Sequence, residues 1–159
     1  MATLLFSRAC SYAIRALTYL AMQPAGKLSG TREISDHEGI PHSFLCKVLL
    51  QARRKRLLRS HKGIGGGYEL ALPAQKISLR MIIHSFDEDV AFDECLLENR
   101  SCLERGQCPL HEPWRAIREQ LVDFLERNTL AELVRQRQAT NGQGAADTSP
   151  AGWTGYRTR

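Results

Sequence analysis

Three cysteines and one histidine lie within a segment of seventeen residues, at Cys95, Cys102, Cys108 and His111. Six residues separate the first two cysteines, five separate the second from the third, and two separate Cys108 from His111. Thiolate sulfur and imidazole nitrogen bind soft or borderline metals, and side chains at this spacing converge only if the loop between them wraps around a common centre. The segment therefore predicts a metal or iron–sulfur site.

Packing of these cysteines as small hydrophobic residues is the alternative interpretation. Their neighbours are too polar for a core, since they include Glu94, Glu98, Arg100, Glu104 and Arg105. The other two cysteines, Cys10 and Cys46, lie apart from the segment, and we expect Cys10 to be packed. An odd number of cysteines without a secretion signal favours reduced thiols or metal ligation over a disulfide framework.

Charge is distributed unevenly along the 159 residues. Residues 1–86 carry 13 Lys and Arg against 4 Asp and Glu, whereas residues 87–159 carry 9 against 13, so net charges of +9 and −4 sum to +5. A basic first half favours a polyanionic partner such as nucleic acid. The sequence contains no run of eighteen apolar residues, so it predicts no membrane span. The N-terminal apolar stretch is too short for a signal peptide. We therefore expect a cytoplasmic protein without a membrane partner.

The elements before the cysteine segment predict a mainly α-helical fold that contains a helix-turn-helix. Apolar residues recur at spacings of three and four along residues 7–23, which predicts an amphipathic helix. Residues 28–39 predict a short helix, capped by Ser29 or Thr31 and ended by Gly39, and a second helix follows from Pro41. Two short helices joined by a tight glycine turn form a helix-turn-helix, whose second helix can enter the major groove of DNA.

A run of cations follows the second helix, at Arg53, Arg54, Lys55, Arg56, Arg59 and Lys62. It leads into two short apolar segments joined by a glycine-rich loop, which predicts a small two-stranded hairpin. A hairpin directly after a helix-turn-helix is a wing, which can follow phosphates or the minor groove. A nucleotide-phosphate loop is excluded, because the required order of strand, loop and helix is absent and no Gly-Lys-Ser/Thr follows.

The residues after the wing predict three further helices. The first covers residues 77–86, with Ser78 as its cap. The second is long and amphipathic and runs from Pro113 to about Arg127, and Thr129 with Glu132 forms a capping box for a short third helix. The long helix needs a partner for its apolar face, and we expect a second copy in a two-fold dimer, with packing on the first helix as the alternative or addition. The predicted dimer interface comprises Trp114, Ile117, Leu121, Phe124 and Leu125.

These elements predict four consecutive parts of the chain. Residues 1–90 form a winged-helix DNA-binding domain, and residues 91–111 form a cysteine-rich cluster-binding loop. Residues 112–138 form the dimerisation helix and the short helix after it. Residues 139–159 lack periodicity and are rich in small and polar residues, which predicts a disordered tail.

Three segments in this order, residues 34–60, 61–73 and 108–134, resemble the winged-helix regulators typified by IscR and NsrR, the iron–sulfur-cluster and nitric-oxide-sensing transcription factors. The resemblance is specific because it joins a wing ending in Gly-Gly-Tyr to three spaced cysteines and a following long helix. It implies a homodimeric transcriptional regulator, a repressor, that binds a pseudo-palindromic DNA operator. It also implies an iron–sulfur cluster on Cys95, Cys102 and Cys108, through which redox state, cluster status or nitric oxide controls operator affinity.

The resemblance points to His111 as the fourth ligand, as in IscR-like members, which use a histidine three residues after the last cysteine. NsrR-like members use an acidic residue near the start of the first helix, where this chain has Ser11, a poor ligand. Three cysteines and one histidine favour a [2Fe–2S] cluster over a [4Fe–4S] cluster. The residues expected to contact DNA are His42, Ser43, Phe44, Lys47, Arg53, Arg54, Arg59 and Lys62.

This chain departs from the family pattern in both predicted sites. Cys46 replaces a glutamate that family members have in the second helix of the helix-turn-helix, and Lys62 stands where the wing usually has arginine. The resemblance therefore does not imply which DNA sequence this chain prefers. A structural zinc on the same four residues, or thiol-based sensing without a cluster, is the alternative to an iron–sulfur sensor. A thiol redox enzyme is not expected, because there is no Cys-x-x-Cys pair.

Overall fold

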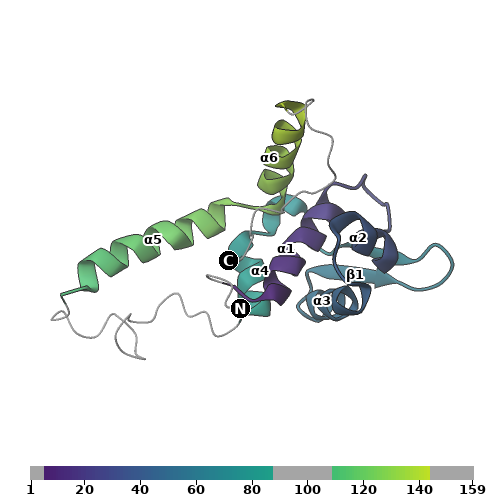
Figure 1. Ribbon diagram of the computed structural model, residues 1–159, viewed down its shortest axis with the longest axis horizontal. Coiled ribbons are helices and arrows are strands. Elements are labelled where there is room, and N and C mark those ends of the chain that lie inside the picture. Colours follow the sequence, from purple (N-terminus) through teal and green to yellow (C-terminus); the bar gives the residue numbers. More distant parts are fainter. Residues whose placement is uncertain (1–5, 88–108, 144–159) are drawn as a thin grey trace, which may run out of the picture.

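The computed structural model describes residues 6–87 and 109–143, which form helices and one small two-stranded hairpin. The elements are α1 (Arg8–Ala21), α2 (Thr31–Glu38), α3 (His42–Arg54), β1 (Leu58–His61), β2 (Gly67–Leu70), the 3-10 helix η1 (Ala74–Lys76), α4 (Leu79–Phe86), α5 (His111–Arg127) and α6 (Leu130–Gln143). In Figure 1, α1 to α4 and the hairpin form one body, α5 extends from it as a long arm, and α6 returns to pack on α1. The prediction of a mainly α-helical winged helix-turn-helix is confirmed.

Helix α1 lies at the centre of the core. Its N-cap is Ser7, whose hydroxyl accepts a hydrogen bond of 3.1 Å from the backbone N–H of Cys10. Ala13, Ala16 and Leu17 are no more than 1 % exposed, and their spacing gives one buried face. Small alanine side chains on this face let neighbouring helices approach closely, so α1 contacts α2, α3, α4 and α6.

Helices α2 and α3 form the predicted helix-turn-helix. Gly39 ends α2 in the left-handed region with φ 61°, which glycine adopts without a steric penalty. The Ser35 hydroxyl then donates a 2.7 Å hydrogen bond to the carbonyl of Ile40 and closes the turn. The predicted cap was wrong: the N-cap of α2 is Gly30, with no side-chain hydrogen bond, because the backbone of Ser29 pairs with the wing instead.

The wing is an antiparallel hairpin in which Leu58 pairs with Leu70 and His61 with Gly67. Ser29 adds a further backbone bridge, since its N–H and carbonyl both bond to Tyr68, at 3.1 and 2.9 Å. A side chain at Gly67 would not fit, because its Cβ would lie 2.7 Å from the Ser29 carbonyl oxygen. The wing is therefore fixed to the segment that leads into the helix-turn-helix.

The C-terminal helices differ from the prediction at their ends. Ser78 caps α4 as predicted, by accepting from the Met81 N–H at 3.2 Å. Helix α5 begins at His111, two residues before the predicted start. Helix α6 reaches Gln143, so residues 139–143, which were predicted to belong to a disordered tail, are helical, and the rest of that predicted tail lies outside the described residues.

The junction between α5 and α6 is bonded to the start of α4. The N–H of Leu79 donates to the carbonyl of Asn128, and the N–H of Leu130 donates to the carbonyl of Ile77, both at 2.9 Å. Arg80 and Glu126 add an ion pair between α4 and α5. Among the described residues, no helix is long and apolar enough to cross a membrane.

Candidate nucleic-acid interface and cysteine segment

Helix α3 is fixed by one apolar face and leaves the opposite face open. Leu45, Val48, Leu49 and Ala52 are at most 2 % exposed and pack in the main core. The predicted DNA-contacting residues of this helix all have exposed side chains, and they are His42, Ser43, Phe44, Lys47, Arg53 and Arg54. The structure thus brings a polar and cationic set together on one side of the second helix of the helix-turn-helix.

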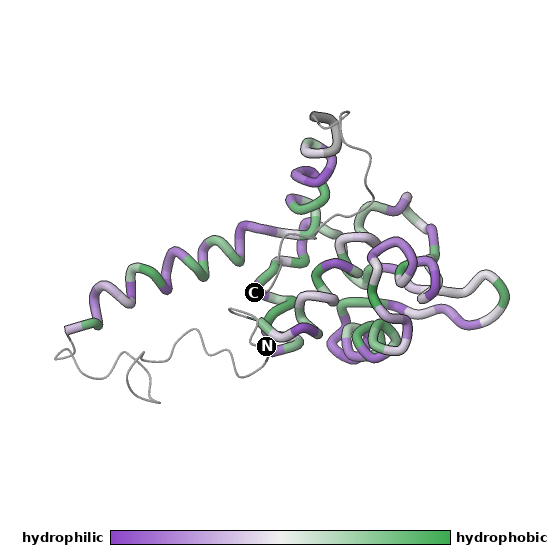
Figure 2. Tube along the Cα trace, viewed as in Figure 1, coloured by the Kyte–Doolittle hydropathy of each residue, from purple (hydrophilic) through white to green (hydrophobic). Residues whose placement is uncertain are grey.

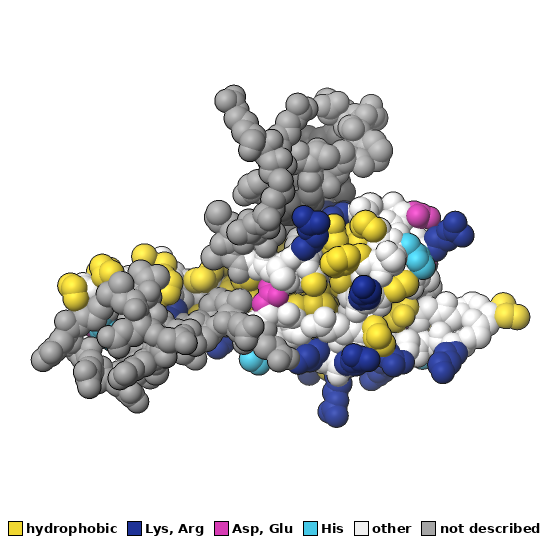
Figure 3. All heavy atoms as spheres, turned by 60° about the horizontal axis from the view of Figure 1, so that its bottom comes forward, with side chains coloured by type: hydrophobic (Ala, Val, Ile, Leu, Met, Phe, Trp, Pro, Cys, Tyr) yellow, Lys and Arg dark blue, Asp and Glu magenta, His cyan; other side chains and the backbone are white. Residues whose placement is uncertain are grey.

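The wing continues this surface. Arg59 on β1 and Lys62 beyond it are exposed, and Ile64 stands fully in solvent at the loop. Arg53 at the end of α3 donates a 3.2 Å hydrogen bond to the hydroxyl of Ser60 on β1, which ties the helix to the hairpin. In Figure 3, Lys and Arg side chains gather over this face of the molecule, and few acidic side chains lie among them.

The same face has two features that the sequence prediction did not include. Leu50 is 40 % exposed on α3 between the predicted contacts, where an apolar side chain can meet a thymine methyl group. The Sγ of Cys46 lies 3.8 Å from the Nδ1 of His42, one helical turn earlier. The spacing of four residues on one helix could have indicated this contact between His42 and Cys46.

The four predicted cluster ligands are only partly within the described residues. Cys95, Cys102 and Cys108 lie outside them. His111 is the first residue of α5, its side chain is 21 % exposed, and its Nε2 lies 3.8 Å from the Oε1 of Glu112. Among the described residues, no three His, Cys, Asp or Glu side chains are grouped closely enough to bind a metal.

Cys10 is a buried thiol of a different kind. It is fully buried against Ile83 and Leu125. Burial raises the pKa of its thiol to about 12, with a further contribution from the carboxylate of Asp87. A thiol that stays protonated and inaccessible is unsuited to ligation, and the expectation that Cys10 is packed agrees with this position.

The predicted dimer residues of α5 divide into two groups. Ile117 and Phe124 are 58 % and 56 % exposed, and Trp114 is half-buried. Leu125 is 2 % exposed and packs within the chain, with Leu121 beside it. In the described chain, Leu125 therefore faces α1 and α4 and not an open surface. Figure 2 shows hydrophobic and hydrophilic residues alternating along α5, as an amphipathic arm requires.

Comparison with known proteins agrees with this geometry. The family model described as "Rrf2: Iron-dependent Transcriptional regulator" matches residues 6–136. The transcriptional regulator IscR of Pectobacterium atrosepticum is 32 % identical over 137 residues, which cover 86 % of this chain and 83 % of that protein. IscR of Escherichia coli O1:K1 / APEC is 30 % identical over 140 residues, which cover 88 % and 86 %.

Solved structures share the fold. The global cysteine regulator CymR of B. subtilis superposes with a TM-score of 0.73 at 21 % identity, covering 84 % of this chain and 98 % of that one. The structure of T. potens IscR gives a TM-score of 0.65 at 21 % identity, covering 89 % and 92 %.

Proposed function

Because this chain belongs to the Rrf2 family of transcriptional regulators, we propose that it is a homodimer that binds a pseudo-palindromic operator and senses its signal through an iron–sulfur cluster. The family and its members are regulators and not enzymes, and helix-turn-helix DNA binding is their shared property.

The exposed face of α3 beside the wing is the observation that carries the proposal. A recognition helix reads base edges in the major groove, while a wing contacts phosphates or the minor groove. Ser43, Phe44 and Lys47 lie on the open face of α3, and Arg59 and Lys62 lie on the wing, so both kinds of contact are available from one side. The Arg53–Ser60 hydrogen bond helps to hold α3 and the wing in a fixed relative position.

Two copies are supported by the exposed apolar residues of α5. Ile117 and Phe124 are seven residues apart, which puts them on the same side of the helix. Leu110 and Met81 are also exposed, at 41 % and 38 %. Large apolar side chains on a projecting helix favour a two-fold contact in which the same surface of each copy is buried. Two joined α3 helices could then meet half-sites about 34 Å apart.

The donor set fits an iron–sulfur cluster. Three thiols, at Cys95, Cys102 and Cys108, and the imidazole of His111 are ligand types found in such clusters, and [2Fe–2S] is the form we propose first. When bound, the cluster would supply a redox-active centre. The description of the family as iron-dependent favours iron over zinc at these residues.

His111 is the residue through which this site would act on the fold. It begins α5, and the other end of α5 is bonded to the start of α4. Ligation through His111 would hold the first residue of α5 beside the cysteine segment. Release of His111 would free that end of α5 and alter the spacing of the two α3 helices, and with it the affinity for paired half-sites.

Anaerobic purification followed by an absorption spectrum and assays of iron and acid-labile sulfide tests the cluster. Brown protein with iron and sulfide supports the proposal, whereas colourless protein with stoichiometric zinc would replace it with a constitutive DNA-binding protein. His111→Ala should make the cluster less stable, while circular dichroism of the winged helix stays unchanged. Equal cluster stability in this variant would identify another fourth ligand.

A further inference from the structure

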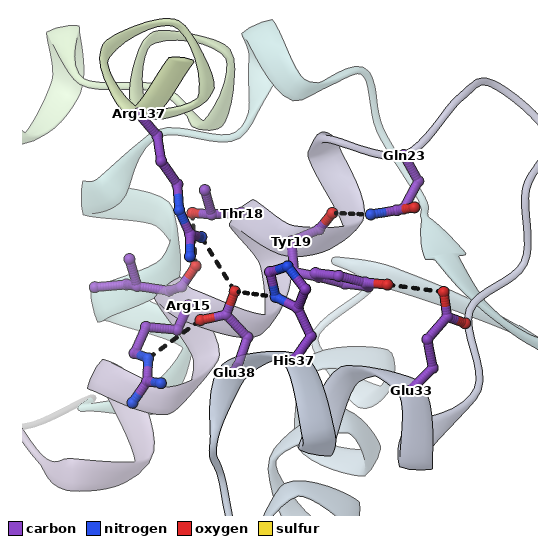
Figure 4. A network of polar contacts seen from close by, with 9 residues as sticks. Arg15, Thr18, Tyr19, Gln23, Glu33, His37, Glu38 and Arg137 are labelled. Carbon is purple, nitrogen blue, oxygen red and sulfur yellow. Dashed lines mark hydrogen bonds and ion pairs between the residues drawn. The ribbon is translucent and has the colours of Figure 1, made fainter. Parts of the chain in front are cut away.

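Glu38, at the end of α2, is a buried carboxylate shared by cations from two other helices. Its side chain is 3 % exposed. The Nε of Arg15 on α1 donates to Oε2 at 3.3 Å, and a guanidinium N–H of Arg137 on α6 donates to Oε1 at 3.1 Å. The Nδ1 of the neighbouring His37 also lies 3.1 Å from Oε1 (Figure 4). Helices α1, α2 and α6 therefore meet at one carboxylate.

A series of ring contacts leads from this carboxylate to α3, the second helix of the helix-turn-helix. The guanidinium carbon of Arg15 lies 5.9 Å from the centre of the Tyr12 ring. The Tyr12 ring in turn packs edge-on against Phe44, with ring centres 5.4 Å apart and planes at 85°. Phe44 belongs to the first turn of α3 and is 39 % exposed on the predicted DNA-contacting face.

The position of Arg15 depends on how Glu38 is neutralised. A buried carboxylate that loses one of its cationic partners leaves an uncompensated charge, so the remaining partner is drawn into closer contact with it. Arg15 is that remaining arginine if Arg137 is removed. A shift of Arg15 relative to Glu38 would change its contact with the Tyr12 ring, which packs against Phe44.

We propose that Arg137 and Glu38 are positioning residues for DNA recognition, which act through Arg15 and Tyr12 on Phe44. This inference rests on the proposed DNA surface of α3. Because α6 follows α5 directly, the network also connects the C-terminal part of the chain to α3 indirectly, through Glu38, Arg15 and Tyr12. Neither Arg137 nor Glu38 touches DNA in this arrangement.

Arg137→Met and Arg135→Met form a matched test on one helix. Arg135 is exposed and pairs with Glu132 in the same helix, so its loss leaves the Glu38 network intact. The probes are the duplex that the wild-type protein selects from a randomised pool and a scrambled duplex of equal length. Arg137→Met should weaken binding to the selected duplex about fivefold. It should leave binding to the scrambled duplex unchanged, and Arg135→Met should change neither.

Rescue separates positioning from a purely structural role. Arg137→Lys keeps a cation near Glu38 and should recover most of the selectivity. Arg15→Lys keeps the charge beside Glu38 but loses the planar cation over Tyr12, so it should lower selectivity as Arg137→Met does. Thermal denaturation must show that each variant is folded at the assay temperature, and Arg15→Lys serves as the test if Arg137→Met is not.

Lys47→Ala distinguishes the failure of this inference from the failure of the proposed DNA surface. If Lys47→Ala weakens binding and folded Arg137→Met and Arg15→Lys both keep the wild-type ratio of selected to scrambled affinity, the network is only structural and the inference is overturned. If Lys47→Ala binds as wild type does, the DNA surface itself is wrong, and the inference falls with it.

Discussion

At the scale of single residues, exposure divides the candidate groups into those that can reach a ligand and those that cannot. Lys47 is exposed on the open face of α3, whereas Cys10 has no exposed surface. His111 lies between these extremes, at 21 % side-chain exposure. Each group therefore has a different measurable property: DNA affinity for Lys47, stability at alkaline pH for Cys10, and cluster retention for His111.

Lys47→Ala should weaken binding to DNA and lower its salt dependence. A lysine that contacts a phosphate releases a counterion on binding, so its loss should reduce the slope of log affinity against log salt concentration by about 1 for each copy. Fluorescence anisotropy at several salt concentrations measures the slope. Lys76→Ala is the control, because Lys76 is exposed on η1 and outside the predicted DNA-contacting residues. An unchanged slope with unchanged affinity in Lys47→Ala would contradict the DNA surface proposed for α3.

Cys10→Ala should make stability less sensitive to alkaline pH. The folded state holds the Cys10 pKa at about 12, against an ordinary value of 9.0, so between these values only the unfolded thiol loses its proton. The unfolded state then binds fewer protons, and the free energy of unfolding falls by about 1.4 kcal/mol for each pH unit above 9 on account of this group. Urea denaturation at pH 8 and pH 10 should show a smaller loss in Cys10→Ala. An equal loss would place the sensitivity elsewhere, for example at Tyr19.

At the scale of elements, the sequence was most informative where periodicity and turn chemistry act locally. The Gly39 turn, the Ser78 cap and the apolar face of α3 were predictable because each depends on residues within one or two turns. The N-cap of α2 was not, because the Ser29 backbone pairs with Tyr68, thirty-nine residues away. The Glu38–Arg137 pair, ninety-nine residues apart in sequence, was equally inaccessible to a local pattern.

The amphipathic arm shows the same limit. Periodicity put Ile117, Phe124 and Leu125 together as dimer residues, since all three are apolar and regularly spaced. It could not divide that set, because packing of Leu125 with Cys10 and Ile83 depends on how α5 meets α1 and α4. The pattern therefore gave the helix and its apolar character, and only the tertiary structure showed which apolar residues remain exposed.

Ile117→Lys should weaken the proposed dimer. The side chain is 58 % exposed, so the substitution should not disturb the folded chain, but a lysine would be buried without a partner in a two-fold contact. Analytical ultracentrifugation should show dissociation at concentrations at which the wild type is dimeric. Glu119→Lys adds the same side chain on the opposite side of α5 and should leave the dimer intact. Dimers of equal strength in both variants would exclude this face.

At the scale of the whole molecule, the chain has a basic N-terminal part and an acidic C-terminal part, and we expect them to have different functions. The cations of residues 1–86 supply attraction for a polyanion, which any duplex shares. The proposed cluster ligands lie in the acidic half, which carries a net charge of −4 and should stay away from DNA phosphate. In the proposed mechanism, a signal at the cysteine segment would therefore act through the spacing of the two α3 helices and not through charge at the phosphate contacts.

Removal of iron and sulfide should change affinity for a selected duplex and leave affinity for a scrambled duplex constant. A hundredfold change would require about 2.7 kcal/mol of coupling between the two sites. Anaerobic and chelator-treated protein, compared on both duplexes at one salt concentration, measures this coupling. Equal affinities for the selected duplex would leave a DNA-binding regulator without cluster sensing.

The bonds that join Asn128 and Leu130 to the start of α4, with the packing of Leu125 on Cys10 and Ile83, hold the C-terminal end of α5 in place. Residues 111–121 of α5 extend about 15 Å beyond this packed end, so a rotation of about 8° would carry the His111 end through about 2 Å. A small rotation near the core thus gives a displacement at the His111 end that is similar to the helix shifts of about 1–2 Å seen in switching proteins. A chemical change at His111 would therefore act at the end of α5 where a given rotation produces the largest displacement.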